Sequence, residues 1–362
     1  MNRFLLYFTL CLILFASCNK DDITNDTSTH RTIIVYMAAD NDLSDDAWVN
    51  INDMQRSFEY KGVNLVVFLD TADEAPYVLD IKRGGSTTVR TYPEFNSADA
   101  TQMEQVLRDI INMYTTDSYG LILWSHGSSW LPAGRQLKSF GDDNGRQMDI
   151  AALVAALPVS FDFIIFDACL MGSVEVAYQL RHKTDFVIAS STEIIYLGFP
   201  YDLIVPELIK QNPNLQNVAK IYFEYYDRMQ GAYRSASISL INTKEMESLA
   251  MATSQFLEGA VFDASSFDRS SVQRLDVYSE QYAFDFLDFL EKAFPDADIV
   301  PLKEQLDKTV QYKAHTPRFI NEYNISTFCG LSCYIPHPLR NDLNAFYQQM
   351  EWTQVSGFYR LL

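Results

Sequence analysis

The feature that most constrains this chain is a mostly apolar run, residues 161–166, that leads directly into a turn containing a cysteine. Because the run is apolar and includes two β-branched residues, it predicts a strand buried on both faces of a parallel sheet. Asp167 and Cys169 follow at its carboxyl end, and Gly172 precedes a helical pattern. Ligands of parallel sheets bind at this edge, and a helix N-terminus lowers the pKa of a nearby thiol. We therefore expect Cys169 to be a reactive thiolate.

A second apolar run, residues 121–124, ends in Ser125, His126 and Gly127. If the two runs form neighbouring strands, His126 and Cys169 meet at the same sheet edge, and a thiol beside an imidazole is a nucleophile with its base. The alternative is a buried core cysteine and a histidine that serves only its turn. These two residues alone leave both interpretations open.

The two motifs together resemble those of a known family. A strand that ends in Ser-His-Gly (125–127), followed later by a strand that ends in Asp-Ala-Cys-Leu-Met-Gly (167–172), is similar to the clostripain family of cysteine peptidases. The resemblance extends from about Arg31 to residues 330–336. It implies a caspase-like α/β/α sandwich with a mostly parallel central sheet. It also implies a catalytic dyad of His126 and Cys169, with the backbone N–H groups of Gly127 and Cys169 as oxyanion donors.

The resemblance also implies a pocket for the substrate residue that precedes the scissile bond. In the family, an acid near the nucleophile and a second acid in a following loop accept a basic side chain. Asp167 matches the first acid, but Leu197 stands where relatives carry the second. We therefore expect a weakened or altered preference for Arg or Lys. Glu193 and Phe199 are the other substrate-binding residues expected in this loop.

A long segment without clear periodicity, residues 128–147, lies between the two motifs. Loops of this length are usually functional. Relatives are cut within the corresponding segment, so the resemblance implies an activation site here. The candidate cleavage positions are Arg135, Lys138 and Arg146.

Strand and helix patterns alternate over residues 31–242, which predicts a catalytic core with a parallel sheet and crossover helices. Within it, residues 77–82 and 88–92 predict a hairpin off the main sheet. Residues 243–326 have mainly helical patterns and predict a helical subdomain. Residues 327–362 are expected to form a final core strand and a C-terminal segment.

The first residues have the pattern of a secretory signal. Arg3 precedes an apolar stretch, residues 4–15, that is too short to span a bilayer, and residues 15–18 resemble a bacterial lipobox. This predicts a signal peptide over 1–17, lipidation of Cys18 and a flexible tether over 18–30. Residues 19–22 resemble the surface-export signal of Bacteroidetes lipoproteins. Ordinary signal-peptidase cleavage and a plain acidic tether are the alternatives.

Charge and composition restrict the partners. The formal net charge of −19 makes nucleic acid an unsuitable partner, because phosphate binding requires a basic surface. Thiolate chemistry requires no cofactor, and none is expected. Carboxylate oxygens that calcium would accept are present, but solvated acidic loops are the simpler interpretation. These oxygens belong to Asp40, Asp42, Asp45, Asp142 and Asp143.

Together these features predict a cell-envelope endopeptidase that is lipid-anchored in the outer membrane, with surface exposure left open. Its substrates would be proteins or peptides. The alternative is a catalytically silent caspase-like scaffold that acts as a surface binding lipoprotein. A missing histidine or cysteine would indicate that alternative, and both residues are present.

Overall fold

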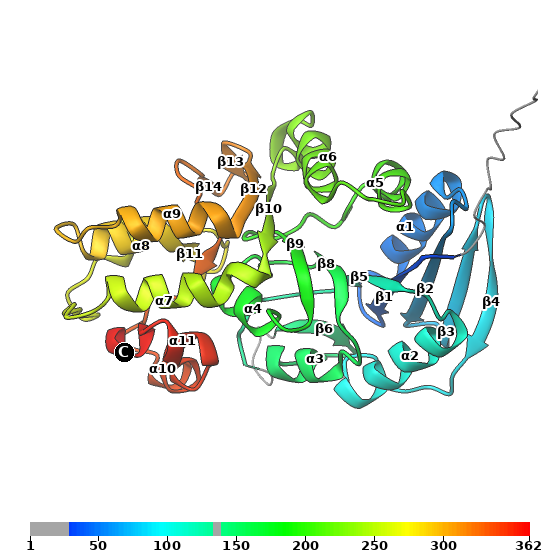
Figure 1. The fold of residues 1–362 in the computed structure, drawn as a ribbon, viewed down its shortest axis with the longest axis horizontal. Coiled ribbons are helices and arrows are strands. Elements are labelled where there is room, and N and C mark those ends of the chain that lie inside the picture. The colour runs from blue at the N-terminus through cyan, green and yellow to red at the C-terminus, as the bar shows by residue number, and fades with distance from the viewer. Residues whose placement is uncertain (1–28, 133–138) are drawn as a thin grey trace, which may run out of the picture.

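The centre of the molecule is a nine-stranded sheet with the strand order β12-β10-β9-β8-β5-β1-β2-β3-β4 (Figure 1). The structure is a computed structural model that describes residues 29–132 and 139–362. Five neighbouring strands in the middle of the sheet run parallel. They are β9 (Thr184–Ala189), β8 (Phe161–Asp167), β5 (Ser118–Trp124), β1 (Arg31–Ala39) and β2 (Val63–Thr71).

Antiparallel strands extend both edges of this parallel centre. They are β3 (Glu74–Lys82) and β4 (Gly85–Thr91) at one edge, and β10 (Ser237–Asn242) and β12 (Val310–His315) at the other. The hairpin expected off the main sheet is therefore part of it. The expectation was wrong because β3 pairs along most of β2, a long-range pairing that the hairpin pattern does not encode.

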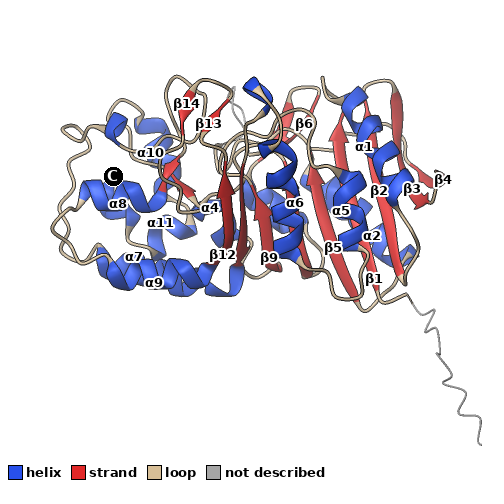
Figure 2. Cartoon of the chain, turned by 90° about the horizontal axis from the view of Figure 1, so that it is seen from above, coloured by secondary structure: helices blue, strands red, loops and turns tan. Residues whose placement is uncertain are grey.

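Helices cover both faces of the sheet and complete an α/β/α sandwich (Figures 1 and 2). One face carries α1 (Ser44–Ser57), α5 (Tyr201–Leu208) and α6 (Leu215–Asp227), and the other carries α2 (Ala100–Met113), α3 (Ile150–Ala156) and α4 (Val174–Gln179). Because side chains alternate along a strand, each face contributes to a separate apolar cluster. The expected caspase-like α/β/α architecture with a parallel centre is confirmed.

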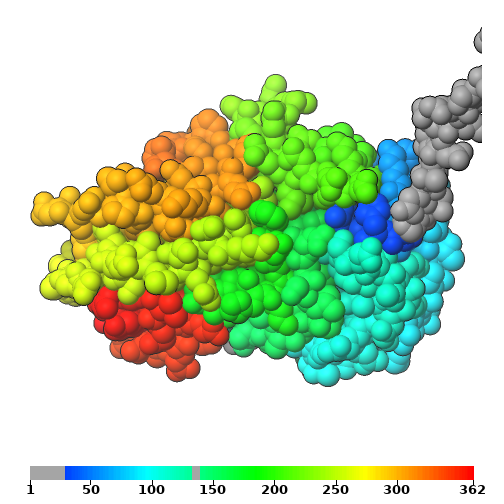
Figure 3. Space-filling view, in the orientation of Figure 1, coloured from blue at the N-terminus to red at the C-terminus, as the bar shows by residue number. Residues whose placement is uncertain are grey.

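The C-terminal third forms a group of helices at one end of the sheet (Figures 1 and 3). These are α7 (Met246–Phe256), α8 (Phe286–Ala293), α9 (Val300–Thr309), α10 (Asn341–Gln348) and α11 (Glu351–Val355). The group is not separate from the core, because β12 lies within it in sequence and α11 contacts both α4 and α7. The boundaries at residues 243 and 327 stay predictions.

Short strands complete the fold outside the main sheet. They are the pairs β6 (Phe140–Asp143) with β7 (Arg146–Met148), β11 (Phe284–Asp285) with β15 (Ser332–Cys333), and β13 (Arg318–Phe319) with β14 (Tyr323–Asn324). The final core strand expected over 327–335 is thus only β15, and it pairs outside the main sheet. In the described part of the chain, no helix has the length and apolar character that crossing a membrane requires.

Candidate active site

The pairing of β5 with β8 brings the two sequence motifs together. The strands are parallel with Trp124 opposite Asp167, and the backbone N–H of Ser125 donates to the Asp167 carbonyl at 3.3 Å. As a result, His126 and Cys169 line one pocket of about 250 Å³ at the carboxyl edge of the sheet. The structure therefore places both predicted catalytic residues at one site.

The turn that carries Cys169 is fixed by residues 190–200, which we call the pocket loop. Leu170 has a φ of +64°, an unfavourable left-handed conformation for a non-glycine residue. Its N–H donates to the Thr192 carbonyl at 2.9 Å. The thiol itself contacts the next part of the loop: the Ile194 N–H donates to Sγ at 3.3 Å, and Sγ lies 3.7 Å from the Ile194 carbonyl oxygen. The orientation of the thiol thus depends on this backbone.

The expectation that the position of Cys169 lowers its thiol pKa was wrong. Burial raises the pKa of Cys169 to about 12, and the charges of Glu193 and Asp167 act in the same direction, while the hydrogen bond from Ile194 opposes them. The first turn of α4 begins at Val174 and is capped by the Ser173 hydroxyl. Its N-terminal N–H groups are therefore not the donors that reach the thiol.

The hydrogen-bond partner of His126 is Asp42, which the sequence analysis considered only as a possible calcium ligand. The distance between His126 Nε2 and Asp42 Oδ1 is 2.7 Å, and the Asp42 side chain is 82% exposed. No hydrogen bond joins His126 to Cys169, both of which lie in the described residues. Asp42 follows β1, the neighbour of β5, so its place at this sheet edge could have been inferred from topology.

Gly127 lies against the nucleophile turn, as the expected oxyanion site requires. Gly127 lies opposite Phe140 in an isolated antiparallel bridge. The hydrogen bonds of this bridge are made by the neighbouring residues, so the Gly127 N–H takes no part in them. A Cβ atom at Gly127 would lie 2.7 Å from the Cys169 carbonyl oxygen. Only glycine fits this approach, which brings the backbone of Gly127 next to that of Cys169.

Of the four expected substrate-binding residues, Asp167 is the one that lines the pocket. Its Oδ2 accepts hydrogen bonds from the Phe199 N–H and the Tyr201 hydroxyl, each at 3.0 Å. Burial raises the pKa of Asp167 to about 6, although these two hydrogen bonds oppose the shift. The carboxyl group is therefore mainly ionised at neutral pH and is neutral in mild acid.

The other three residues lie outside the pocket lining. Phe199 is buried against Tyr222, with ring centroids 4.4 Å apart, and Leu197 is half-buried. Glu193 is also buried. Pocket-lining residues that the sequence analysis missed include the apolar and aromatic side chains of Leu43, Trp124, Ile194, Ile195 and Tyr196. They lie in loops and at a strand end, where the sequence has no hydrophobic periodicity or motif that would indicate a pocket.

Some predicted positions lie outside the described residues, namely Cys18, Arg135 and Lys138. The third candidate cleavage position, Arg146, is exposed at the start of β7. Within residues 29–132 and 139–362, no group of three or more His, Cys, Asp or Glu side chains is arranged to hold a metal ion.

An α/β/α sandwich that places a cysteine and a histidine at the ends of adjacent parallel strands has the architecture of a caspase-like cysteine peptidase. A family model described as the Clostripain family matches residues 35–353. The chain belongs to this family.

Solved structures support the assignment. The chain is similar to an inactive zymogen C11 protease from Parabacteroides distasonis, at 28% identity and a TM-score of 0.81. It is also similar to a secreted C11 cysteine protease from Bacteroides thetaiotaomicron in complex with an irreversible peptide inhibitor, at 30% identity and a TM-score of 0.78. Each match covers 91% of this chain and 99% of the other.

Clostripain from Hathewaya histolytica is 25% identical to this chain over 215 residues. The match covers 48% of this chain and 41% of that protein. The matched region therefore spans less than half the length of this curated relative.

The raised pKa of Cys169 predicts slow alkylation of its thiol by iodoacetamide near neutral pH. Since the thiolate is the reactive form, the rate should rise about tenfold per pH unit between pH 7 and 10 without a plateau. Mass spectrometry of the modified peptide separates Cys169 from the buried Cys329 and Cys333. A plateau below pH 8 would contradict the prediction, because the thiolate would then already predominate.

Proposed function

We propose that the protein is an endopeptidase of the cell envelope that cleaves peptide bonds through Cys169 and His126. The observation that carries the proposal is their place in one pocket at the carboxyl edge of the sheet. A catalytically silent scaffold would not require both groups there. The peptide inhibitor bound to the Bacteroides thetaiotaomicron relative supports a peptide as the ligand of this site.

In the proposed reaction, the proton of the Cys169 thiol passes to His126, and the resulting thiolate attacks the scissile carbonyl carbon and forms a C–S bond. The C–N bond then breaks, and His126 gives its proton to the leaving amine. The N–H groups of Gly127 and Cys169 stabilise the negative charge on the carbonyl oxygen. Water hydrolyses the thioester, with His126 accepting a proton from that water, and the thiolate is released.

The described arrangement is the resting form in this proposal. His126 is hydrogen-bonded to Asp42 and makes no hydrogen bond to the thiol. Burial favours the neutral form of the thiol. The similar structure from Parabacteroides distasonis is described as an inactive zymogen, which is consistent with such a form. Activation then requires His126 to leave Asp42 and the region around Cys169 to favour the thiolate.

The preference for a basic residue before the scissile bond is proposed to be weak. Asp167 can attract a cationic side chain, but its Oδ2 already accepts two hydrogen bonds from the protein. Leu197 carries no charge and lies outside the pocket lining. A guanidinium in the pocket would therefore lack part of the compensation that its desolvation requires.

Replacement of either dyad member tests the mechanism. Cys169→Ala and His126→Ala should each lower kcat for peptide hydrolysis by several orders of magnitude, and the double variant should lose little more, because the two groups act as a unit. His182→Ala is the matched control, since His182 is an exposed histidine paired with Glu247. Near wild-type turnover of Cys169→Ala would show that another group is the nucleophile.

The ionisation of Asp167 predicts how specificity depends on pH. Because the pKa of this carboxyl is about 6, its charge is lost as pH falls through 6 and is present above it. The ratio of kcat/KM for an Arg substrate to that for a norleucine substrate should rise roughly tenfold from pH 5 to 7. Comparing substrates at the same pH cancels the titration of the dyad.

Asp167→Asn is the control, because the amide oxygen still accepts the hydrogen bonds from Phe199 and Tyr201. Its substrate ratio should be low and independent of pH. A wild-type ratio that does not change between pH 5 and 7 would exclude Asp167 as the acceptor of the basic side chain.

The proposed location rests on the lipobox-like residues that precede Cys18. Acyl chains on this cysteine would hold the protein at the membrane surface. In cells that express the full chain, Cys18→Ser should move the protein from the membrane fraction to the soluble fraction. Equal membrane association of the two forms would contradict lipidation at this position.

A further inference from the structure

The backbone at residues 192–194 controls the position of the nucleophile. Thr192 accepts the hydrogen bond from Leu170, and Ile194 contacts the Cys169 sulfur through both its N–H and its carbonyl group. The Ile194 N–H is the larger of two backbone donors that favour the thiolate, and the other is the N–H of Cys169 itself. A small shift of this segment would therefore change both the orientation and the acidity of the thiol.

Glu193 lies between these two contacts in the sequence and does not line the pocket. It is 9% exposed. Its Oε1 accepts a hydrogen bond from the Val277 N–H at 2.9 Å. Its Oε2 is buried and has no hydrogen-bond partner among the described residues. A buried carboxyl with one partner is costly, and it joins two loops that are far apart in sequence.

Val277 belongs to a loop, residues 276–283, that is held together from within. The Asp276 carboxylate accepts hydrogen bonds from three backbone N–H groups of this loop, those of Tyr278 at 2.9 Å, Tyr282 at 2.6 Å and Ala283 at 2.6 Å. Tyr278 and Cys169 pack against the same apolar cluster. The loop therefore packs near Cys169 and also contacts the pocket loop through Val277.

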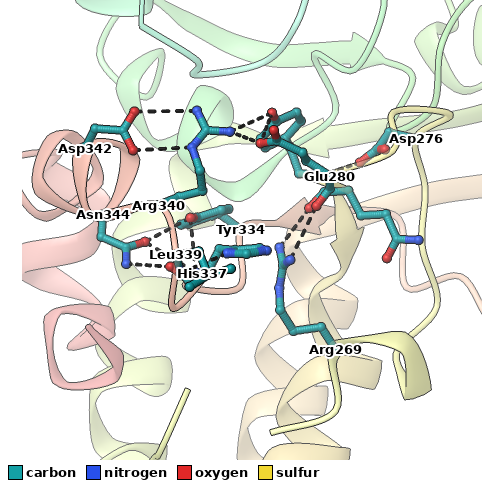
Figure 4. A network of polar contacts seen from close by, with 11 residues as sticks. Arg269, Asp276, Glu280, Tyr334, His337, Leu339, Arg340, Asp342 and Asn344 are labelled. Carbon is teal, nitrogen blue, oxygen red and sulfur yellow. Dashed lines mark hydrogen bonds and ion pairs between the residues drawn. The ribbon is translucent and has the colours of Figure 1, made fainter. Parts of the chain in front are cut away.

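Two arginines hold the 276–283 loop from outside, Arg269 from the segment before it and Arg340 from the C-terminal segment (Figure 4). Arg340 forms ion pairs with Glu280 and Asp342. Arg269 donates to the Glu280 carbonyl at 3.3 Å and to the Gln281 carbonyl at 2.7 Å. The contacts form a continuous path from these arginines through the loop and Glu193 to the thiol.

We propose that Glu193 is a positioning residue that ties the pocket loop to the 276–283 loop and thereby holds the Ile194 N–H against the Cys169 sulfur. The inference rests on the proposed function, because it gives Glu193 a role in preparing the nucleophile. It replaces the expectation that Glu193 binds substrate, since the side chain is buried and does not line the pocket.

The charge of Glu193 and its hydrogen bond to Val277 have opposite effects on the ionisation of the Cys169 thiol. Burial raises the pKa of Glu193 to about 7; Asp276 adds to the shift and Arg274 opposes it. Tyr278 and Tyr323 also face this carboxyl and have raised pKa values. Above pH 7 the ionised carboxyl disfavours the Cys169 thiolate, whereas the hydrogen bond to Val277 favours it through Ile194.

The test compares Glu193→Gln with Glu193→Ala, since both lack the charge and only the first keeps an acceptor for the Val277 N–H. Alkylation of Cys169 by iodoacetamide is followed from pH 6 to 10 by mass spectrometry. We expect Glu193→Ala to react about tenfold more slowly than Glu193→Gln, and its kcat for peptides to fall with little change in KM. Glu193→Gln should react faster than the wild-type protein above pH 7.

Glu207→Ala is the matched control. Glu207 is also buried and accepts hydrogen bonds from Lys210, Asn214 and Asn217, far in sequence from the thiol. This variant should lose stability to denaturant without changing the pH profile of Cys169 alkylation. Equal alkylation profiles for Glu193→Gln and Glu193→Ala would overturn the proposal.

If Glu193→Ala does not fold, Arg340→Ala provides the second test, because it loosens the 276–283 loop and leaves the carboxyl in place. It should also slow the alkylation of Cys169, and an unchanged rate would overturn the proposal. The chemical readout does not require peptidase activity. A protein that shows these alkylation differences but hydrolyses no peptide would contradict the proposed function alone.

Discussion

The site depends on the parallel pairing of β5 with β8. This pairing sets Trp124 opposite Asp167, so the two strands end at the same level of the sheet. One continues into His126 and Gly127, and the other into Ala168 and Cys169. The close approach of the Gly127 and Cys169 backbones follows from it. Because a one-residue slip would turn every side chain of a strand to the opposite face, the two apolar clusters fix this register and, through it, the relative positions of His126 and Cys169.

The strands that carry the site could be predicted because their signal is local. The apolar runs before His126 and Cys169 form β5 and β8 as expected, and the motifs after them meet at one edge. The partners of these residues could not be predicted in the same way. The contacts of His126 with Asp42 and of Glu193 with Val277 join loops that are separated by 84 residues in each case. Loop contacts of this kind leave no periodic pattern in the sequence, so topology places Asp42 at the right sheet edge but the contacts themselves are seen only in the folded chain.

The C-terminal third is more than a cover for the sheet. Its strand β12 completes one edge, and buried polar contacts connect it to the helix that follows the nucleophile. The Glu175 carboxylate in α4 accepts hydrogen bonds from the Tyr334 N–H at 3.0 Å and the Tyr347 hydroxyl at 2.7 Å. Since an unpaired buried carboxylate is costly, the position of α4 and the position of the C-terminal segment depend on each other. These contacts explain why residues 243–326, which the sequence predicts as a helical subdomain, pack as one body with the rest of the sheet and its helices.

In the proposed mechanism, His126 and Cys169 are held in a resting form by interactions of different strength. The contact of His126 with Asp42 is short, but Asp42 is largely exposed, and a polar contact at the surface contributes little because water competes for both partners. The thiol is restrained by burial, which raises its pKa to about 12, and every pKa unit by which the thiolate must be favoured has a free-energy cost. In the proposed mechanism, release of His126 is therefore the easier step. The larger free-energy cost lies at Cys169, where burial of the thiol disfavours the thiolate and the hydrogen bond from the Ile194 N–H offsets only part of that cost.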